Sequence, residues 1–156
     1  MNLFEHLLPL DNRFELVHHE LTAAQMHFYF RSQASSACCP KCQVVSTRRH
    51  SQTKRKIRDL PISEKEVYLY ILLRKWFCSN EACATKIFTE SIEAAPAYHR
   101  NTVRVTNQLR ELAFQSNCVQ AAKLSEKLHV PVSHDTLLRL IYQTPQPTET
   151  SPFPRH

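Results

Sequence analysis

Glycine is missing from this chain of 156 residues, although it makes up about 7% of an average protein. Its absence argues against a glycine-rich phosphate-binding loop, and turns must use proline, asparagine, aspartate, serine or histidine instead. No apolar run is long enough to span a membrane. No basic start with a small-residue cleavage site marks a secretory signal. We therefore expect a cytoplasmic protein with no membrane partner, in a reducing setting where paired cysteines favour metal over disulfides.

The charge of the chain is strongly positive. Lysine and arginine number 20 against 14 acidic residues, which gives a net charge of +6 and a pI near 9.1. This excess of positive charge suits binding to a polyanion such as nucleic acid. The alternative is that the charges only keep the surface solvated. The hydrophobic fraction of 42% predicts a folded chain, and the length predicts one domain or two small ones.

Four of the six cysteines form two closely spaced pairs, Cys39-Pro40-Lys41-Cys42 and Cys78-Ser79-Asn80-Glu81-Ala82-Cys83. Zinc prefers four soft ligands in a tetrahedron, and two short-spaced pairs on separate turns supply them. We predict that Cys39, Cys42, Cys78 and Cys83 bind one structural Zn²⁺. Cys38 lacks the two-residue spacing to Cys42 and is interpreted as a residue that does not bind the metal. Cys38 or a histidine such as His50 remains an alternative ligand. Cys118 lies far from the pairs and is expected to be a small buried hydrophobe.

A thiol oxidoreductase is the alternative function for the first cysteine pair. A thiol of low pKa beside Lys41 would suit disulfide exchange by Cys39 and Cys42. That motif usually opens a helix after a parallel strand, whereas strand-like sequence follows it here. The second cysteine pair also favours metal.

Alternating apolar residues predict a small antiparallel β domain of the zinc-ribbon type. Pro61 is expected to end the third strand. The fourth is the most apolar and is expected to be central, with both faces covered. A short helix or leader is expected before residue 12. The predicted strands cover residues 14–21, 26–31, 48–58, 67–73 and 87–90.

The third of these strands is densely basic. Side chains of this kind can neutralise phosphates and release counterions. A solvated strand face is the alternative, but the overall charge favours phosphate contact. The predicted DNA-contacting residues of this strand are Arg48, Arg49, Lys54, Arg55, Lys56 and Arg58.

After Pro96 the apolar period changes from two to about 3.6, which predicts three helices. The first begins near Asn101, its expected cap, and the second is capped by Ser116 or Asn117. The third runs from His134 to about Gln143. His129 stands where a left-handed residue often ends a helix. The three helices fit a helix-turn-helix unit, although many small helical bundles have the same pattern. In such a unit the third helix reads bases, here with Ser133, His134, Thr136 and Arg139.

The predicted fold class is therefore α+β, with a proline-rich tail. We divide the chain into a leader and β-hairpin (1–34), a zinc-binding domain (35–92), a helix-turn-helix domain (98–143) and a disordered linker (144–156).

Four sequence blocks follow one another along the chain. They are Cys39-Pro40-Lys41-Cys42; His50-Ser51 with Arg55 and Asp59-Leu60-Pro61; Arg74 to Cys83 with Ile87-Phe88-Thr89-Glu90; and Ser133 to Arg139. In this order they resemble the N-terminal region of bacterial insertion-sequence transposases of the ISL-three family.

The resemblance implies a zinc-binding domain and a helix-turn-helix that bind double-stranded DNA at the terminal inverted repeats of the element. It also implies a cytoplasmic protein that is associated with the nucleoid. In the family a ribonuclease-H-like domain with a DDE carboxylate triad cuts the strands, and this sequence stops where that domain would begin. We therefore expect a truncated transposase without an enzymatic site. A homodimer or the full-length transposase is the expected partner, and an alternative role is repression of transposition.

Overall fold

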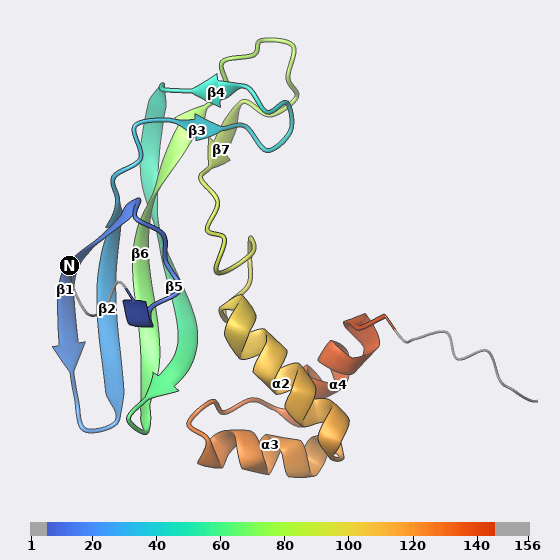
Figure 1. The fold of residues 1–156 in the computed structure, drawn as a ribbon. Helices are drawn as coiled ribbons and strands as arrows, with labels where there is room; N and C mark the ends of the chain where they lie inside the picture. The colour runs from blue at the N-terminus through green and yellow to red at the C-terminus, as the bar shows by residue number, and fades with distance from the viewer. Residues whose placement is uncertain (1–5, 146–156) are drawn as a thin grey trace, which may run out of the picture.

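The computed structural model describes residues 6–145 (Figure 1). A long twisted β-sheet carries a small two-stranded ribbon at one end, and three helices lie beside its other end. The predicted α+β class is confirmed. Strands β1 to β7 span Phe14–Leu21, Gln25–Ser32, Ala37–Cys38, Val45–Ser46, Arg49–Ile62, Lys65–Phe77 and Ile87–Thr89, and helices α2 to α4 span Val103–Gln115, Cys118–Lys127 and His134–Gln143.

The main sheet has the strand order β1-β2-β6-β5, and β7 pairs with the end of β6. Three of its four pairings are antiparallel, as predicted, but β2 and β6 run parallel. The prediction of an antiparallel domain was wrong for this pair. The chain between β2 and β6 forms the two-stranded ribbon and β5, and this long connection brings β6 back alongside β2 in the same direction. The predicted division between residues 34 and 35 crosses this sheet, and the domain boundaries themselves stay predictions.

Strand β6 is central, as its apolar sequence predicted, but only one of its faces is fully buried. Val67, Leu69, Ile71 and Leu73 alternate along that face and are at most 3% exposed. They pack with apolar side chains of β1, β2 and the segments around Leu8 and Ile92. The intervening side chains, Tyr68, Tyr70 and Leu72, are half-buried on the opposite face. The prediction that both faces are covered therefore holds for one face only.

Pro61 does not end β5, which continues to Ile62. The prediction failed because β5 is an edge strand of the main sheet, and its ladder to β6 skips from Asp59 to Ile62. A residue in that gap needs no N–H group for the ladder, so proline is tolerated there.

Five turn positions have positive φ, and none is glycine. They are Gln43, Ser63, Glu64, Tyr98 and His129, with φ between 49° and 65°. Ser63 and Glu64 form the tight hairpin between β5 and β6, a place where glycine or asparagine is usual. The left-handed conformation predicted at His129 is confirmed.

The three helices begin at side-chain caps. Thr102 caps α2, Asn117 caps α3 and Ser133 caps α4, and each side chain accepts a hydrogen bond from a backbone N–H one turn later. The prediction of Asn101 as the first cap was wrong, because its side chain accepts a hydrogen bond from Arg58 instead. The helices enclose a core of their own around Val105, Leu109, Ala121 and Leu137. Within residues 6–145 no helix is long and apolar enough to cross a membrane.

Polar contacts around the end of β5 join the sheet to α2. Asp59 is 1% exposed and accepts hydrogen bonds from the Thr102 hydroxyl and Arg104 Nε, both at 2.8 Å. Arg58 exchanges backbone hydrogen bonds with Arg100 and Thr102 at 2.8 and 3.0 Å. These contacts fix the start of α2 against the sheet. The predicted N-terminal leader and proline-rich linker lie partly outside the described residues.

Candidate metal centre and nucleic-acid interface

The two cysteine pairs lie on tight turns at one end of the sheet. After Cys39 the chain turns back at once, with the Gln43 N–H donating to the Cys39 carbonyl at 2.9 Å. In the second turn, the Cys83 N–H donates to the Asn80 carbonyl at 3.1 Å. The Asn80 side chain accepts from the Ala82 N–H at 3.0 Å, which stabilises that turn locally. Both turns therefore present their cysteines to the same point.

The four sulfur atoms have the spacing of a tetrahedral metal site. Cys39 and Cys83 Sγ are 4.0 Å apart, and Cys42 and Cys78 Sγ are 3.6 Å apart. All four lie within 4.8 Å of one another. Zinc–sulfur bonds of about 2.3 Å in a tetrahedron place sulfurs about 3.8 Å apart. The cysteines fit one structural zinc ion, as predicted.

Electrostatic effects within the cluster favour a bound cation. Burial raises the pKa of Cys39, but backbone N–H groups of Cys42 and Lys41 and the neighbouring thiols outweigh this and lower it to about 7. For Cys78, the Asn80 N–H lowers the pKa, but burial and the other three thiols together raise it to about 12. Four thiols in one place therefore do not all ionise easily, and a divalent cation stabilises all four thiolates together.

A small hydrophobic core surrounds the sulfurs. Trp76 is fully buried against Cys39 and Cys83, together with Phe88 and Ala34. Trp76 therefore packs around the metal site. Its Nε1–H has no hydrogen-bond partner among residues 6–145.

The alternative ligands lie outside the cluster. Cys38 is exposed on β3, opposite Val45. His50 has its Nδ1 2.7 Å from the Ser51 hydroxyl and lies edge-on to Phe77. Cys118 is partly buried against the helical core. A dithiol redox site needs only Cys39 and Cys42, whereas here Cys42 lies beside Cys78 in a cluster of four cysteines. The geometry therefore favours metal binding over thiol–disulfide exchange.

Residues 35–83 match the family model described as the zinc-finger of transposase IS204/IS1001/IS1096/IS1165. All four clustered cysteines lie within the matched residues. This segment is therefore similar to the zinc-finger of those transposases. No curated protein and no solved structure matches the chain. The zinc ribbon is continuous with the rest of the sheet, because β5 and β6 extend from the metal centre to the helices (Figure 1).

The predicted basic residues are spread along the whole length of β5. Arg48 and Arg58 are ten residues apart, which corresponds to about 33 Å of extended strand. Arg48 lies over the Phe77 ring at the zinc end, 5.3 Å from its centroid, and Arg49 is exposed next to it. Lys54 is exposed further along the strand. The six residues therefore do not form one compact patch.

Arg55 and Arg58 make structural contacts. Arg55 donates to the carbonyls of Ala95 at 2.9 Å and His99 at 2.8 Å, and also to the Pro96 carbonyl. Arg58 donates to Asn101 Oδ1 at 3.3 Å and to the Pro131 carbonyl at 2.7 Å. Their guanidinium groups hold the loop before α2 and the loop before α4 against the sheet.

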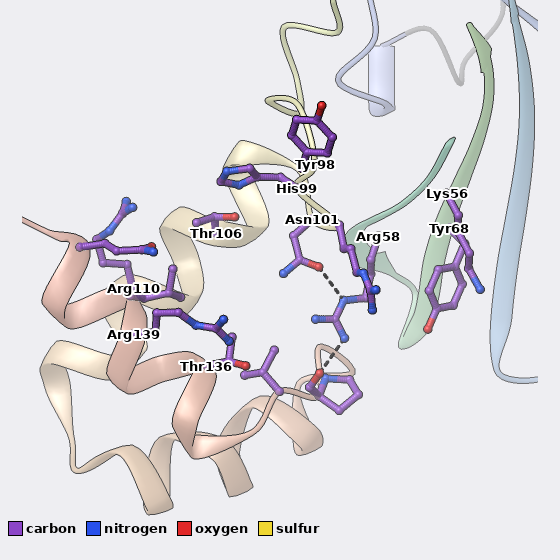
Figure 2. A pocket seen from close by; sticks show the side chains of 15 residues that line it. Lys56, Arg58, Tyr68, Tyr98, His99, Asn101, Thr106, Arg110, Thr136 and Arg139 are labelled. Carbon is purple, nitrogen blue, oxygen red and sulfur yellow. Dashed lines mark hydrogen bonds between the residues drawn. The ribbon is translucent and has the colours of Figure 1, made fainter. Parts of the chain in front are cut away.

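The predicted base-reading residues lie at the exposed start and along one side of α4. Ser133 Oγ accepts from the Thr136 N–H at 3.3 Å, so this hydroxyl caps the helix. His134 is exposed and its Nε2 lies 3.1 Å from Asp135 Oδ1. Thr136 and Arg139 face back toward the sheet (Figure 2).

An open cleft of about 990 Å³ lies between the end of the sheet and the helices (Figure 2). It brings Lys56 and Arg58 of the sheet together with Thr136 and Arg139 of α4, although these residues are far apart in sequence. Lys56 Nζ lies 4.2 Å from the centroid of the Tyr68 ring on the sheet side. Among residues 6–145, no aspartate or glutamate lines the cleft.

Most of the lining residues were missed by the sequence analysis, and four of them bear on nucleic-acid contact. They come from the loop before α2 and from α2 itself: Tyr98, His99, Arg100 and Arg110. None belongs to a charge run or a spaced motif. Only the packing of α2 and α4 beside β5 places them on one surface.

Proposed function

We propose that this chain contains the zinc-stabilised DNA-binding module of an insertion-sequence transposase and binds the terminal inverted repeats of its element. The observation that carries the proposal is the cleft. Five lysine and arginine side chains from β5, α2, α4 and the loop before α2 line it, without an acidic residue. A surface of one charge sign built from separate elements suits the phosphates of DNA.

Helices α3 and α4 act as a helix-turn-helix unit in this proposal. The turn between them begins at His129, whose φ is 58°, and α4 begins at the capping side chain of Ser133. In such units the start of the second helix enters the major groove. In this proposal His134, at the exposed start of α4, reaches base edges, and Thr136 and Arg139, on the side of α4 that lines the cleft, contact a base or a phosphate.

Zinc has a structural role in the module. The ion holds the two turns that end the sheet, and the packing of Trp76 depends on them. Within residues 6–145 the four cysteines are the only group of three or more side chains with metal-ligand geometry. We assign strand cutting to no residue of this part of the chain, because two-metal cleavage requires converging carboxylates.

The test is DNA binding as a function of salt. If all five cations neutralise phosphates, log K falls against log salt with a slope of about −4 to −5. Replacing Arg139 with glutamine should reduce that slope by about one if it contacts phosphate, or relax specificity at one base pair if it contacts a base. Lys127→Gln is the control, because Lys127 is exposed on α3 and does not line the cleft. If Lys127→Gln weakens binding as much as Arg139→Gln, the cleft is not the binding surface.

A further inference from the structure

The cleft is too small for a DNA duplex to enter, although duplex phosphates at its open side can still reach the cationic side chains. Its volume of about 990 Å³ is that of a site for a small organic ligand. The major groove of B-DNA alone is about 12 Å wide, so a duplex rests on the rim formed by α4 and β5. An unpaired strand is narrower and fits inside.

The rim of the cleft also carries an aromatic side chain that the fold does not use. Tyr98 is fully exposed, in contrast to the aromatic side chains in the core of the sheet and in the core around the cysteines. Figure 2 shows it at the edge of the cleft above His99. A ring with both faces open beside cationic groups is the combination that proteins use to bind single-stranded nucleic acid, because bases stack on the ring and phosphates pair with the cations.

The backbone holds Tyr98 in an unfavourable conformation. Its φ is 65°, in the left-handed region that a residue with a Cβ atom generally avoids. The turn is closed by the His99 N–H donating to the Pro96 carbonyl at 3.2 Å. Arg55 reinforces it through the carbonyls of Pro96 and His99. The loop is thus built to present the ring to solvent rather than to bury it.

Arg110 offers an unused donor within the same cleft. Its Nη1 donates to Asn107 Oδ1 at 2.8 Å, whereas its buried Nε has no hydrogen-bond partner among residues 6–145. That Nε is closed to solvent, so a phosphate oxygen in the cleft would instead meet the accessible side of this guanidinium, where a charge-assisted hydrogen bond can form.

We propose that the cleft binds an unpaired DNA strand continuous with the duplex on α4, with Tyr98 stacking on a base and Arg110 binding a phosphate. This inference rests on the proposed function. It adds that the preferred substrate is a duplex with a single-stranded extension rather than a fully paired end.

The experiment compares a blunt duplex carrying the terminal repeat with the same duplex bearing a short unpaired extension on either strand. Fluorescence anisotropy measures both affinities for the zinc-loaded protein. We expect one extended duplex to bind about five- to 150-fold tighter, the range given by stacking of a single base. Tyr98→Ala should remove this advantage and Tyr98→Phe should keep it. Tyr142→Ala, which truncates an exposed tyrosine of α4 outside the cleft, should also keep it.

A fluorescent base analogue, 2-aminopurine, placed in the extension reports stacking directly. Its emission should be quenched by the wild-type protein and by Tyr98→Phe, but not by Tyr98→Ala. Equal affinity for blunt and extended duplexes would overturn the inference while leaving duplex binding intact. An equal loss of affinity for both DNAs in Tyr98→Ala would also overturn it. Failure of the folded protein to bind either DNA would refute the proposed function as well.

Discussion

Zinc removal should loosen one end of the sheet and leave the helices folded. The core around the metal is separate from the core of the sheet and from that of the helices. Besides cysteines, its large buried side chains are Trp76 and Phe88, whose burial supplies about 3–6 kcal/mol. Structural zinc supplies about 10–16 kcal/mol in small zinc-binding peptides, so the ion is the larger contribution at this end.

Trp76 makes this prediction easy to measure, because it is the single tryptophan of the chain and is fully buried beside the cysteines. Chelation should shift its fluorescence emission to the red, while the helical far-ultraviolet circular dichroism persists. Cys39→Ser should behave as the chelated protein does. Cys38→Ser is the matched control, because Cys38 is exposed outside the cluster, and it should retain about one zinc per chain. Loss of zinc without a change in Trp76 emission, or with simultaneous loss of the helices, would refute this reasoning.

Three further predictions concern stability and are checked by urea unfolding. Asp59→Ala leaves Arg104 without its buried acceptor and should lower the free energy of unfolding by about 2–4 kcal/mol. This is less than the loss expected for a fully buried ion pair, because Arg104 is partly exposed. An effect under about 0.5 kcal/mol would show that this contact does not hold α2 to the sheet. Leu137→Ala opens a cavity in the helical core, where the side chain is fully buried, and should cost about 2–5 kcal/mol. The hydrogen bond from Arg13 lowers the pKa of Asp11 below its ordinary 3.8. The pair's contribution to the free energy of unfolding is therefore complete above pH 3.8 and is lost as the pH falls through the lowered pKa. Asp11→Asn should therefore cost less than about 1 kcal/mol at neutral pH and nothing in strong acid; an equal cost at both would contradict the assignment.

Local sequence patterns predicted the parts of the molecule that local chemistry determines. The spacing of Cys39 to Cys42 and of Cys78 to Cys83 pointed to the metal centre because each pair lies on its own short turn. The cap of the second helix was predicted at Ser116 or Asn117 and lies at Asn117, because a side chain there bonds to the backbone of the next turn. The continuous apolar and aromatic run in residues 67–73 identified the central strand.

Contacts between distant segments could not be predicted in this way. The parallel pairing of β2 with β6 depends on how the intervening chain crosses the sheet. In the sequence Asp59 only follows the predicted basic strand, yet its partners, Thr102 and Arg104, lie more than forty positions later. Arg110 has no distinguishing neighbours in sequence, and it enters the cleft only because α2 packs against α4. The basic residues of β5 were found as a group, but their division between the zinc end, the loops and the cleft is a property of the sheet.

The central claim is that the module recognises the ends of its element, and equilibrium binding tests this most directly. The zinc-loaded protein is titrated against a duplex carrying the neighbouring terminal inverted repeat and against a scrambled duplex, at two salt concentrations. The account predicts a preference for the repeat of about a thousandfold or more, with affinity for both duplexes falling steeply with salt. Equal affinity for the two duplexes at both salt concentrations would contradict it.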